Sequence, residues 1–286
     1  MRKCFAVVIF SMSLAFMGPD SRWLLAADPP PSSKGTPSPS ETITGILGAM
    51  AMEMEQLEAQ LTDKKVQKLE DVSFIEGRLK GKKVVLAHSG VGKVNAAMTT
   101  TLLLEHFRPA RVLMTGVAGG LNPDLHPGDI VIGAKIGHHD FGTLTPKGLR
   151  VGPTRNPLTR IRNPVYFPAD ENLLAAAEQA AASVTKEVER SGSARIIKTG
   201  IIVTGDTFVT STSAKLSLRQ DHQADATEME GAAVAQICWQ RRVPCLVIRS
   251  ISDNADEKAN EEFEKFAKMS ADHSALVIVA ILQRLN

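Results

Sequence analysis

The chain has 286 residues, enough for one large domain or two small ones. Hydrophobic residues make up 43% and charged residues 22%, the balance of an ordinary soluble globular protein. The net charge of +2, without a lysine- or arginine-rich run, gives no reason to expect a nucleic-acid partner.

The first 27 residues have the features of a secretory signal peptide. Arg2 and Lys3 precede the apolar run CFAVVIFSMSLAFM, and Ala26 and Ala27 offer a cleavage site. The run is short for a membrane span, which takes about 20 residues. We expect export to a periplasmic or other extracytoplasmic compartment, with no stable membrane insertion after the signal is removed. The alternatives are an uncleaved anchor, or a start codon upstream of the true one, which would make the protein cytoplasmic.

Residues 28–42, DPPPSSKGTPSPSET, are rich in Pro and Ser and predict a disordered linker. Residues 43–286 form one further domain in which apolar runs alternate with helical patterns. Strands, several followed by a Gly-containing turn, are predicted over 43–49, 82–92, 110–120, 128–136, 195–209 and 243–253. Helices are predicted over 50–61, 93–107, 171–184, 231–240 and 261–285. This alternation predicts an α/β sheet covered on both faces.

Five of these strands end in glycine or a carboxylate, in the segments GAMAME, HSGVG, TGVAGG, VTGDTF and RSISD. Ligands of open α/β sheets bind beyond the carboxyl ends of the strands, and glycine lets backbone N–H groups approach them. The five ends together predict one small-molecule site. Each turn alone is weak evidence, since none has the Walker or dinucleotide-binding pattern.

Several acidic residues at these ends could take part in chemistry or could merely stabilise a helix. Asp253 suits a polar site beside Ser252, or it caps the next helix. Glu53, Glu228 and Glu230 could simply be acids at helix starts. The apolar stretch after Glu230 argues that at least one carboxylate is desolvated, and a buried carboxylate needs partners. Two sugar hydroxyls would suit one carboxylate.

Seven segments together resemble those of 5′-methylthioadenosine/S-adenosylhomocysteine nucleosidases, in the purine/uridine nucleoside phosphorylase superfamily. They are GILGAMAMEMEQL, HSGVGKVNAA, TGVAGGL, PGDIVI, VTGDTF, TEMEGAAVA and RSISDNAD. The resemblance covers about residues 43–285, in the family's order and spacing. It implies a three-layer α/β/α fold with a central mixed, twisted β-sheet flanked by helices. It also implies that the substrate is a purine nucleoside.

The resemblance implies three catalytic carboxylates. Asp253 matches the aspartate that delivers a proton to purine N7, and Glu53 matches the glutamate that activates the attacking water. Glu230 matches the glutamate that grips the ribose hydroxyls. Positive charge develops on the ribose as the glycosidic bond breaks, so carboxylates beside it stabilise the transition state.

The resemblance also implies a set of substrate-binding residues around these acids. Phe208, which could otherwise be a core residue, would stack on adenine, and the backbone of Val209 would read the purine edge. Met229 would line the ribose pocket. Glu228 would support it, by reaching the hydroxyls or by capping the helix. The complete predicted set is Ala118, Gly119, Phe208, Val209, Glu228, Met229, Ser252 and Phe263.

No cofactor is implied, because carboxylates and water suffice. A metal site at His138, His139 and Asp140 is not expected, since adjacent histidines on a strand diverge. Cys238 and Cys245 are expected to be buried free thiols rather than a disulfide.

The superfamily suggests a homodimer. The apolar run TTTLLLEHF would suit an interface, but a core role explains it equally well.

The sequence departs from the family in three respects. Ala51 and Met52 precede Glu53, where relatives often carry acids, and the segment 138–170 diverges, so the 5′-substituent of the preferred substrate is undefined. The third departure is the expected export of the chain, since the typical relative is cytoplasmic.

The sequence is compatible with three activities. The first is hydrolysis of 5′-thio-substituted adenosines, and the second is phosphorolysis of a purine nucleoside. Phosphate sites favour arginine, yet none occurs between Lys34 and Gly77 or in HSGVGKVNAA, and Glu53 would repel phosphate. The third is a non-catalytic nucleoside-binding protein, which the joint presence of Glu53, Glu230 and Asp253 argues against.

Overall fold

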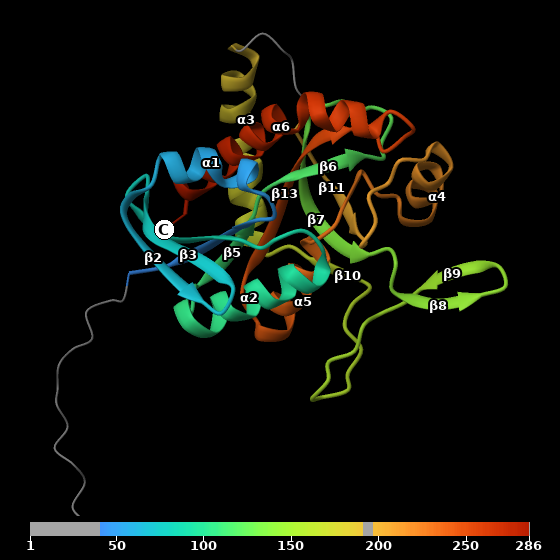
Figure 1. Cartoon of the computed structure of the whole chain (residues 1–286), viewed down its shortest axis with the longest axis horizontal. Helices are drawn as coiled ribbons and strands as arrows, with labels where there is room; N and C mark the ends of the chain where they lie inside the picture. Colours follow the sequence, from blue (N-terminus) through green and yellow to red (C-terminus); the bar gives the residue numbers. More distant parts are fainter. Residues whose placement is uncertain (1–40, 191–196, 286) are drawn as a thin grey trace, which may run out of the picture. The chain divides into compact units, whose positions relative to one another are not determined.

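The structure, a computed structural model, describes residues 41–190 and 197–285 (Figure 1). The predicted signal peptide and all of the predicted linker before residue 41 lie outside these residues. Within the described ranges, no helix is both long enough and apolar enough to cross a membrane.

Eleven of the described strands form one mixed sheet. Its order is β10-β7-β11-β12-β6-β13-β5-β1-β4-β3-β2, and β8 and β9 pair separately as a hairpin. The strands are β1 (Thr44–Gly48), β2 (Thr62–Leu69), β3 (Val72–Leu79), β4 (Lys82–His88), β5 (Arg111–Met114), β6 (Val117–Gly120), β7 (Ile130–His138), β8 (Gly142–Thr145), β9 (Gly148–Val151), β10 (Tyr166–Pro168), β11 (Ile197–Thr204), β12 (Ala226–Glu228) and β13 (Cys245–Asp253).

Part of the sheet closes on itself. Strand β7 pairs parallel with β11 and antiparallel with β13, so β7, β11, β12, β6 and β13 form a ring. On the other side of β13, the strands β5, β1 and β4 continue in parallel. The central strands are buried along most of their length, which explains why their sequences are continuous apolar runs rather than alternating patterns.

Helices cover both faces of the sheet, which confirms the predicted three-layer α/β/α architecture (Figure 1). Helices α1, α3 and α6 lie on one face, and α2 and α5 lie on the other, with α4 beyond the end of the sheet. The helices are α1 (Ala51–Ala59), α2 (Lys93–Phe107), α3 (Glu171–Arg190), α4 (Thr212–His222), α5 (Gly231–Arg241) and α6 (Ala259–Leu282).

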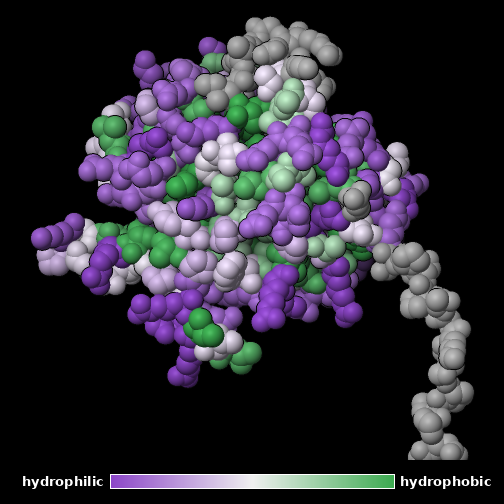
Figure 2. Space-filling view, turned by 180° about the vertical axis from the view of Figure 1, so that it is seen from behind, coloured by the Kyte–Doolittle hydropathy of each residue, from purple (hydrophilic) through white to green (hydrophobic). Residues whose placement is uncertain are grey.

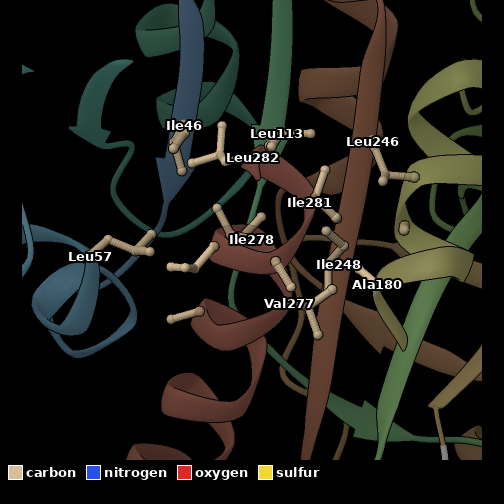
Figure 3. Packing of buried hydrophobic residues seen from close by; sticks show 14 of the residues in the cluster. Ile46, Leu57, Leu113, Ala180, Leu246, Ile248, Val277, Ile278, Ile281 and Leu282 are labelled. Carbon is tan, nitrogen blue, oxygen red and sulfur yellow. The ribbon is translucent and has the colours of Figure 1, made fainter. Parts of the chain in front are cut away.

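Each face has its own aliphatic core. Figure 3 shows Ile278 and Ile281 of α6 packed against Ile46 of β1 and Ile248 of β13. Burying each such side chain stabilises the fold by about 1.5–3 kcal/mol before the loss of conformational entropy is subtracted. On the opposite face, Leu103 and neighbouring residues of α2 pack with the alanines of α5. These two cores fix the positions of the strands whose ends carry the polar residues.

The predicted strand over 110–120 is two strands. Thr115 and Gly116 interrupt it, and Gly116 adopts a φ of +152°, which few side-chain-bearing residues tolerate. The second part, β6, pairs with β12 and β13 instead of continuing beside β1. The interruption turns residues 117–120 toward the strands that carry the acids.

An arm formed by residues 139–165 extends from the end of β7. It contains the β8–β9 hairpin and a loop closed by pairing of Arg155 with Arg162. Its apolar side chains Leu144 and Leu158 are more than 80% exposed. Figure 2 shows the arm at the left, with apolar residues beside hydrophilic ones. The arm thus accounts for most of the segment 138–170, which was predicted from sequence to diverge.

Cys238 and Cys245 are both free, as predicted. Cys238 is buried in α5, and Cys245 is half-buried at the start of β13. In the run TTTLLLEHF, Leu103 and Leu104 are buried in the core. These two leucines therefore contribute to the core, one of the two roles suggested for the run.

Candidate active site

A cavity of about 320 Å³ lies where the carboxyl ends of the strands meet. Its lining comes from the ends of β1, β4, β11, β12 and β13, from β6, and from the starts of α1 and α6. The lining residues are Ala49, Met50, Glu53, Val91, Val117, Ala118, Gly119, Phe208, Thr227, Glu228, Met229, Glu230, Ser252, Asp253, Asn260 and Phe263. Val209 lines a small recess that shares Phe208 and Asp253 with this cavity. The structure thus brings together every residue that the sequence predicted for the site.

Glu53 lies in the first turn of α1 and is 2% exposed. One carboxylate oxygen accepts the backbone N–H groups of Ala49 (2.6 Å) and Met50 (2.9 Å). The other accepts the N–H of Val117 at 3.0 Å. The residue therefore has both suggested roles: it satisfies the start of a helix, and it presents a fixed, desolvated carboxylate to the cavity.

Arg249, in the middle of β13, is fully buried behind the cavity. Its guanidinium donates to the carbonyl of Thr115 at 2.8 Å, forms a short ion pair with Glu228 and lies 3.3 Å from Glu230. Burial alone would lower the pKa of Arg249, but the surrounding carboxylates, Glu228 and Glu230 first, outweigh it and raise the pKa. Arg249 is thus a permanent cation beneath two carboxylates.

The carboxylate of Glu228 is fully hydrogen-bonded within the protein. It accepts the backbone N–H groups of Glu230 (3.0 Å) and Gly231 (2.7 Å), a short hydrogen bond from Thr204 and the ion pair from Arg249. Of the two roles suggested for Glu228, the geometry fits the cap at the start of α5. Its oxygens are already occupied by these donors.

Glu230 is less fully occupied. One oxygen accepts the N–H of Gly92 at 2.8 Å, and the other faces Arg249 at 3.3 Å. Burial raises the pKa of Glu230 to about 7, helped by the charge of Glu228 and opposed by Arg249 and the Gly92 N–H. Its carboxylate opens on the cavity with capacity for further donors, as a ribose-binding group requires.

Asp253 ends β13, lines the same cavity and is 1% exposed. It accepts the hydroxyl of Ser252 at 2.7 Å and the N–H of Ala255 at 2.9 Å. Burial raises the pKa of Asp253, although these two hydrogen bonds oppose the rise. Helix α6 begins only at Ala259, so Asp253 closes a short turn and does not cap that helix. A carboxyl group with a raised pKa is suited to hold and donate a proton.

An aromatic and aliphatic wall completes the cavity. The rings of Phe208 and Phe263 meet edge to face with centroids 5.8 Å apart. Phe208 is 43% exposed, which a core phenylalanine would not be. Met229 lies between the two glutamates on the same lining. The wall offers a flat apolar surface in the same cavity as the carboxylates, which suits a purine attached to a sugar.

The chain is similar to known proteins over most of its length. The model of the phosphorylase superfamily matches residues 43–283. The 5′-methylthioadenosine/S-adenosylhomocysteine nucleosidase of Psychromonas ingrahamii is 39% identical over 245 residues, which are 85% of this chain and 99% of that protein. The chain belongs to this nucleosidase family. The enzyme of the same name from Shewanella loihica is 38% identical, over 84% of this chain and 99% of its own.

Solved structures agree with this assignment. The nucleosidase of Neisseria meningitidis in complex with methylthio-immucillin-A superposes with a TM-score of 0.75 at 38% identity, covering 85% of this chain and all of that one. A futalosine hydrolase of Helicobacter pylori superposes with a TM-score of 0.74 at 35% identity, covering 85% and 98% of the two chains. The nucleosidase fold is therefore shared by proteins whose names specify different substrates.

Two further observations on this nucleosidase-family chain concern metal binding and a second cavity. Among the described residues, no group of three or more His, Cys, Asp or Glu side chains is placed to hold a metal ion. A larger cavity of about 590 Å³ lies beside Trp239 and Cys245, near the start of β13. It is at the opposite end of that strand from Asp253 and contains none of the predicted site residues.

Proposed function

We propose that this protein hydrolyses the N-glycosidic bond of 5′-thio-substituted adenosines, such as 5′-methylthioadenosine and S-adenosylhomocysteine. The products are adenine and the 5′-thio-substituted ribose. One observation carries the proposal: Glu53, Glu230 and Asp253 come from distant parts of the chain and line one cavity with Phe208. Membership of the nucleosidase family supports the same reaction.

The geometry assigns each acid a step. The purine stacks on Phe208, and Asp253 donates a proton to N7, so that the base leaves as a neutral molecule. The C1′–N9 bond breaks, and its electron pair stays with the base while positive charge develops on the ribose. Glu230 binds the ribose hydroxyls, and its negative potential stabilises that charge. Glu53 removes a proton from water as the water oxygen bonds to C1′.

Water fits this cavity better than phosphate does. No arginine or lysine is among the lining residues. Arg249, buried behind them, is already paired with Glu228 and Glu230. A phosphate dianion would therefore lie against three carboxylates without a free cation to neutralise it. This charge pattern favours hydrolysis over phosphorolysis.

Adenine release tests the proposal. Purified protein is incubated with 5′-methylthioadenosine in buffer with and without phosphate, and free adenine is measured. Release without phosphate is the expected result. Strict dependence on phosphate would instead make the protein a phosphorylase, and no release from any purine nucleoside would make it a binding protein. S-adenosylhomocysteine and futalosine, run in parallel, identify the preferred 5′-substituent.

We further propose that two copies pair through the start of α2. Val94 is 79% exposed and Met98 is 44% exposed, next to Val91 at the edge of the cavity. Light scattering should give twice the chain mass, and Val94→Lys should halve it.

Export remains our proposal for residues 1–27. The amino terminus of the protein isolated from cells should lie near residue 28, in an extracytoplasmic fraction.

A further inference from the structure

Three charged residues form a closed network beside the cavity, although none of them lines it. Lys93 is the first residue of α2, Asp140 follows β7, and Asp206 follows β11. The Lys93 ammonium lies 2.6 Å from Asp140 and 3.7 Å from Asp206. The network therefore joins three loops that the sequence separates by more than 40 residues each.

Backbone groups tie the same loops together. Asp206 accepts the backbone N–H of Lys93 at 2.8 Å, and its own N–H donates to Asp140 at 2.9 Å. Helix α2 has Gly92 as its N-cap, without a capping side chain of its own. Asp206 supplies that missing cap from another loop. The first turn of α2 is thus held from outside the helix.

That first turn contacts the ribose-binding acid. Gly92 has a φ of +93°, and its N–H donates to Glu230 at 2.8 Å. The adjacent Lys93 is anchored by both aspartates. A displacement of Lys93 would move the Gly92 N–H, which together with the Arg249 guanidinium holds the carboxylate of Glu230.

We propose that Lys93, Asp140 and Asp206 are positioning residues that orient Glu230 through the Gly92 N–H. The inference rests on the proposed function, because it assigns Glu230 to the ribose. The ion pair between Lys93 and Asp140 is partly shielded from water. Lys93 and Asp140 are only 20% and 26% exposed, so water screens their attraction less than at the surface. Burial raises the pKa of Asp140, but the hydrogen bonds from Lys93 and Asp206 outweigh it and keep the pKa low.

Asp140→Asn tests the network with little change in shape. The asparagine oxygen can still accept the N–H of Asp206, so the loop that carries Phe208 keeps its anchor. The variant loses the negative charge opposite Lys93. We expect kcat/KM for 5′-methylthioadenosine to fall by about 10- to 100-fold, the scale of a catalytic group displaced by up to 1 Å. The affinity for adenine, which has no ribose, should stay within about twofold.

Asp272→Asn is the matched control. Asp272 is also 26% exposed and pairs with Lys268 at 2.5 Å, on α6. This variant should keep the wild-type kcat/KM. Lys93→Met should reproduce the loss seen in Asp140→Asn, and Lys93→Arg should restore part of it. Equal melting temperatures of the variants exclude a general loss of folding.

A double variant decides whether the network acts through Glu230. In a Glu230→Gln background, Asp140→Asn should weaken binding of methylthio-immucillin-A by less than about twofold, against tenfold or more with Glu230 present. Equal losses in both backgrounds would overturn the inference, as would an Asp140→Asn variant with wild-type kcat/KM. A wild-type protein that releases no adenine would instead refute the proposed function, and the binding cycle would still test the network.

Discussion

Replacing Asp253 by asparagine removes the proposed proton donor and leaves the shape of the side chain intact. The remaining oxygen still accepts the N–H of Ala255, now at 2.9 Å. The new amide can donate to the hydroxyl of Ser252, which at present donates to Asp253 at 2.7 Å. The packing and hydrogen bonds of the unliganded protein are therefore preserved, so the change should affect turnover rather than folding.

The expected loss follows from general acid catalysis, which contributes about 10²- to 10⁴-fold. At about 1.36 kcal/mol for each factor of ten, the barrier rises by about 2.7–5.4 kcal/mol. Because Asp253 is 1% exposed, bulk water cannot readily replace the missing donor. We expect kcat to fall by the full factor, while adenine still binds to the wall formed by Phe208.

Initial rates of adenine release give kcat, and calorimetry with adenine gives the binding constant. Asp272→Asn is the control, since Asp272 pairs with Lys268 on α6 and lies outside the cavity. A folded Asp253→Asn variant that works within a few-fold of the wild-type rate would refute the role of Asp253 as proton donor.

Two further predictions concern charge and space in the site. In the proposed reaction Glu230 binds ribose as a carboxylate, and its pKa is raised to about 7. The value of kcat/KM should therefore fall about tenfold for each pH unit below 7, and a pH profile that stays flat down to about 4.5 contradicts this. At Gly116, a Cβ atom would lie 1.9 Å from the Arg249 guanidinium and 2.5 Å from the Glu53 carboxylate. Gly116→Ala should therefore destabilise the protein by about 1–3 kcal/mol and lower the melting temperature by about 2–12 °C, measured by calorimetry. Gly152→Ala, with no atom within 4 Å of its Cβ position, should leave the melting temperature unchanged, and an equal effect of the two substitutions would count against the packing argument.

The sequence predicted the elements whose signal is local. Residues 93–107 form a helix with the predicted bounds, and the apolar runs at 43–49 and 243–253 form strands. The β2–β3 hairpin was missed because residues 62–69 are mostly polar and exposed, without an apolar face to mark a strand. Helix α4, over 212–222, is short and polar and was missed for the same reason.

Glu53 and Asp253 were predictable because each lies at the carboxyl end of a predicted strand, where strand ends meet. Glu230 was predicted only from the family resemblance, since the strand before it, β12, has three residues and was not predicted. Arg249 was not predicted, although an arginine inside the apolar run CLVIRSISD was a visible anomaly. Its partner Glu228 lies 21 residues earlier, and only the pairing of β13 with its neighbours brings the two together. Lys93 and Asp140 were missed likewise, since their ion pair exists only in the folded chain.

The position of β13 determines when this domain can fold during synthesis. Strands β5 and β6 are adjacent in sequence, yet β13, about 130 residues later, lies between them in the sheet. Until Cys245–Asp253 has left the ribosome, both earlier strands expose an unpaired edge, and such edges invite aggregation. The nascent chain therefore needs protection from aggregation through almost its whole translation. The last strand to be synthesised completes the sheet and, in the same step, places Asp253 in the cavity.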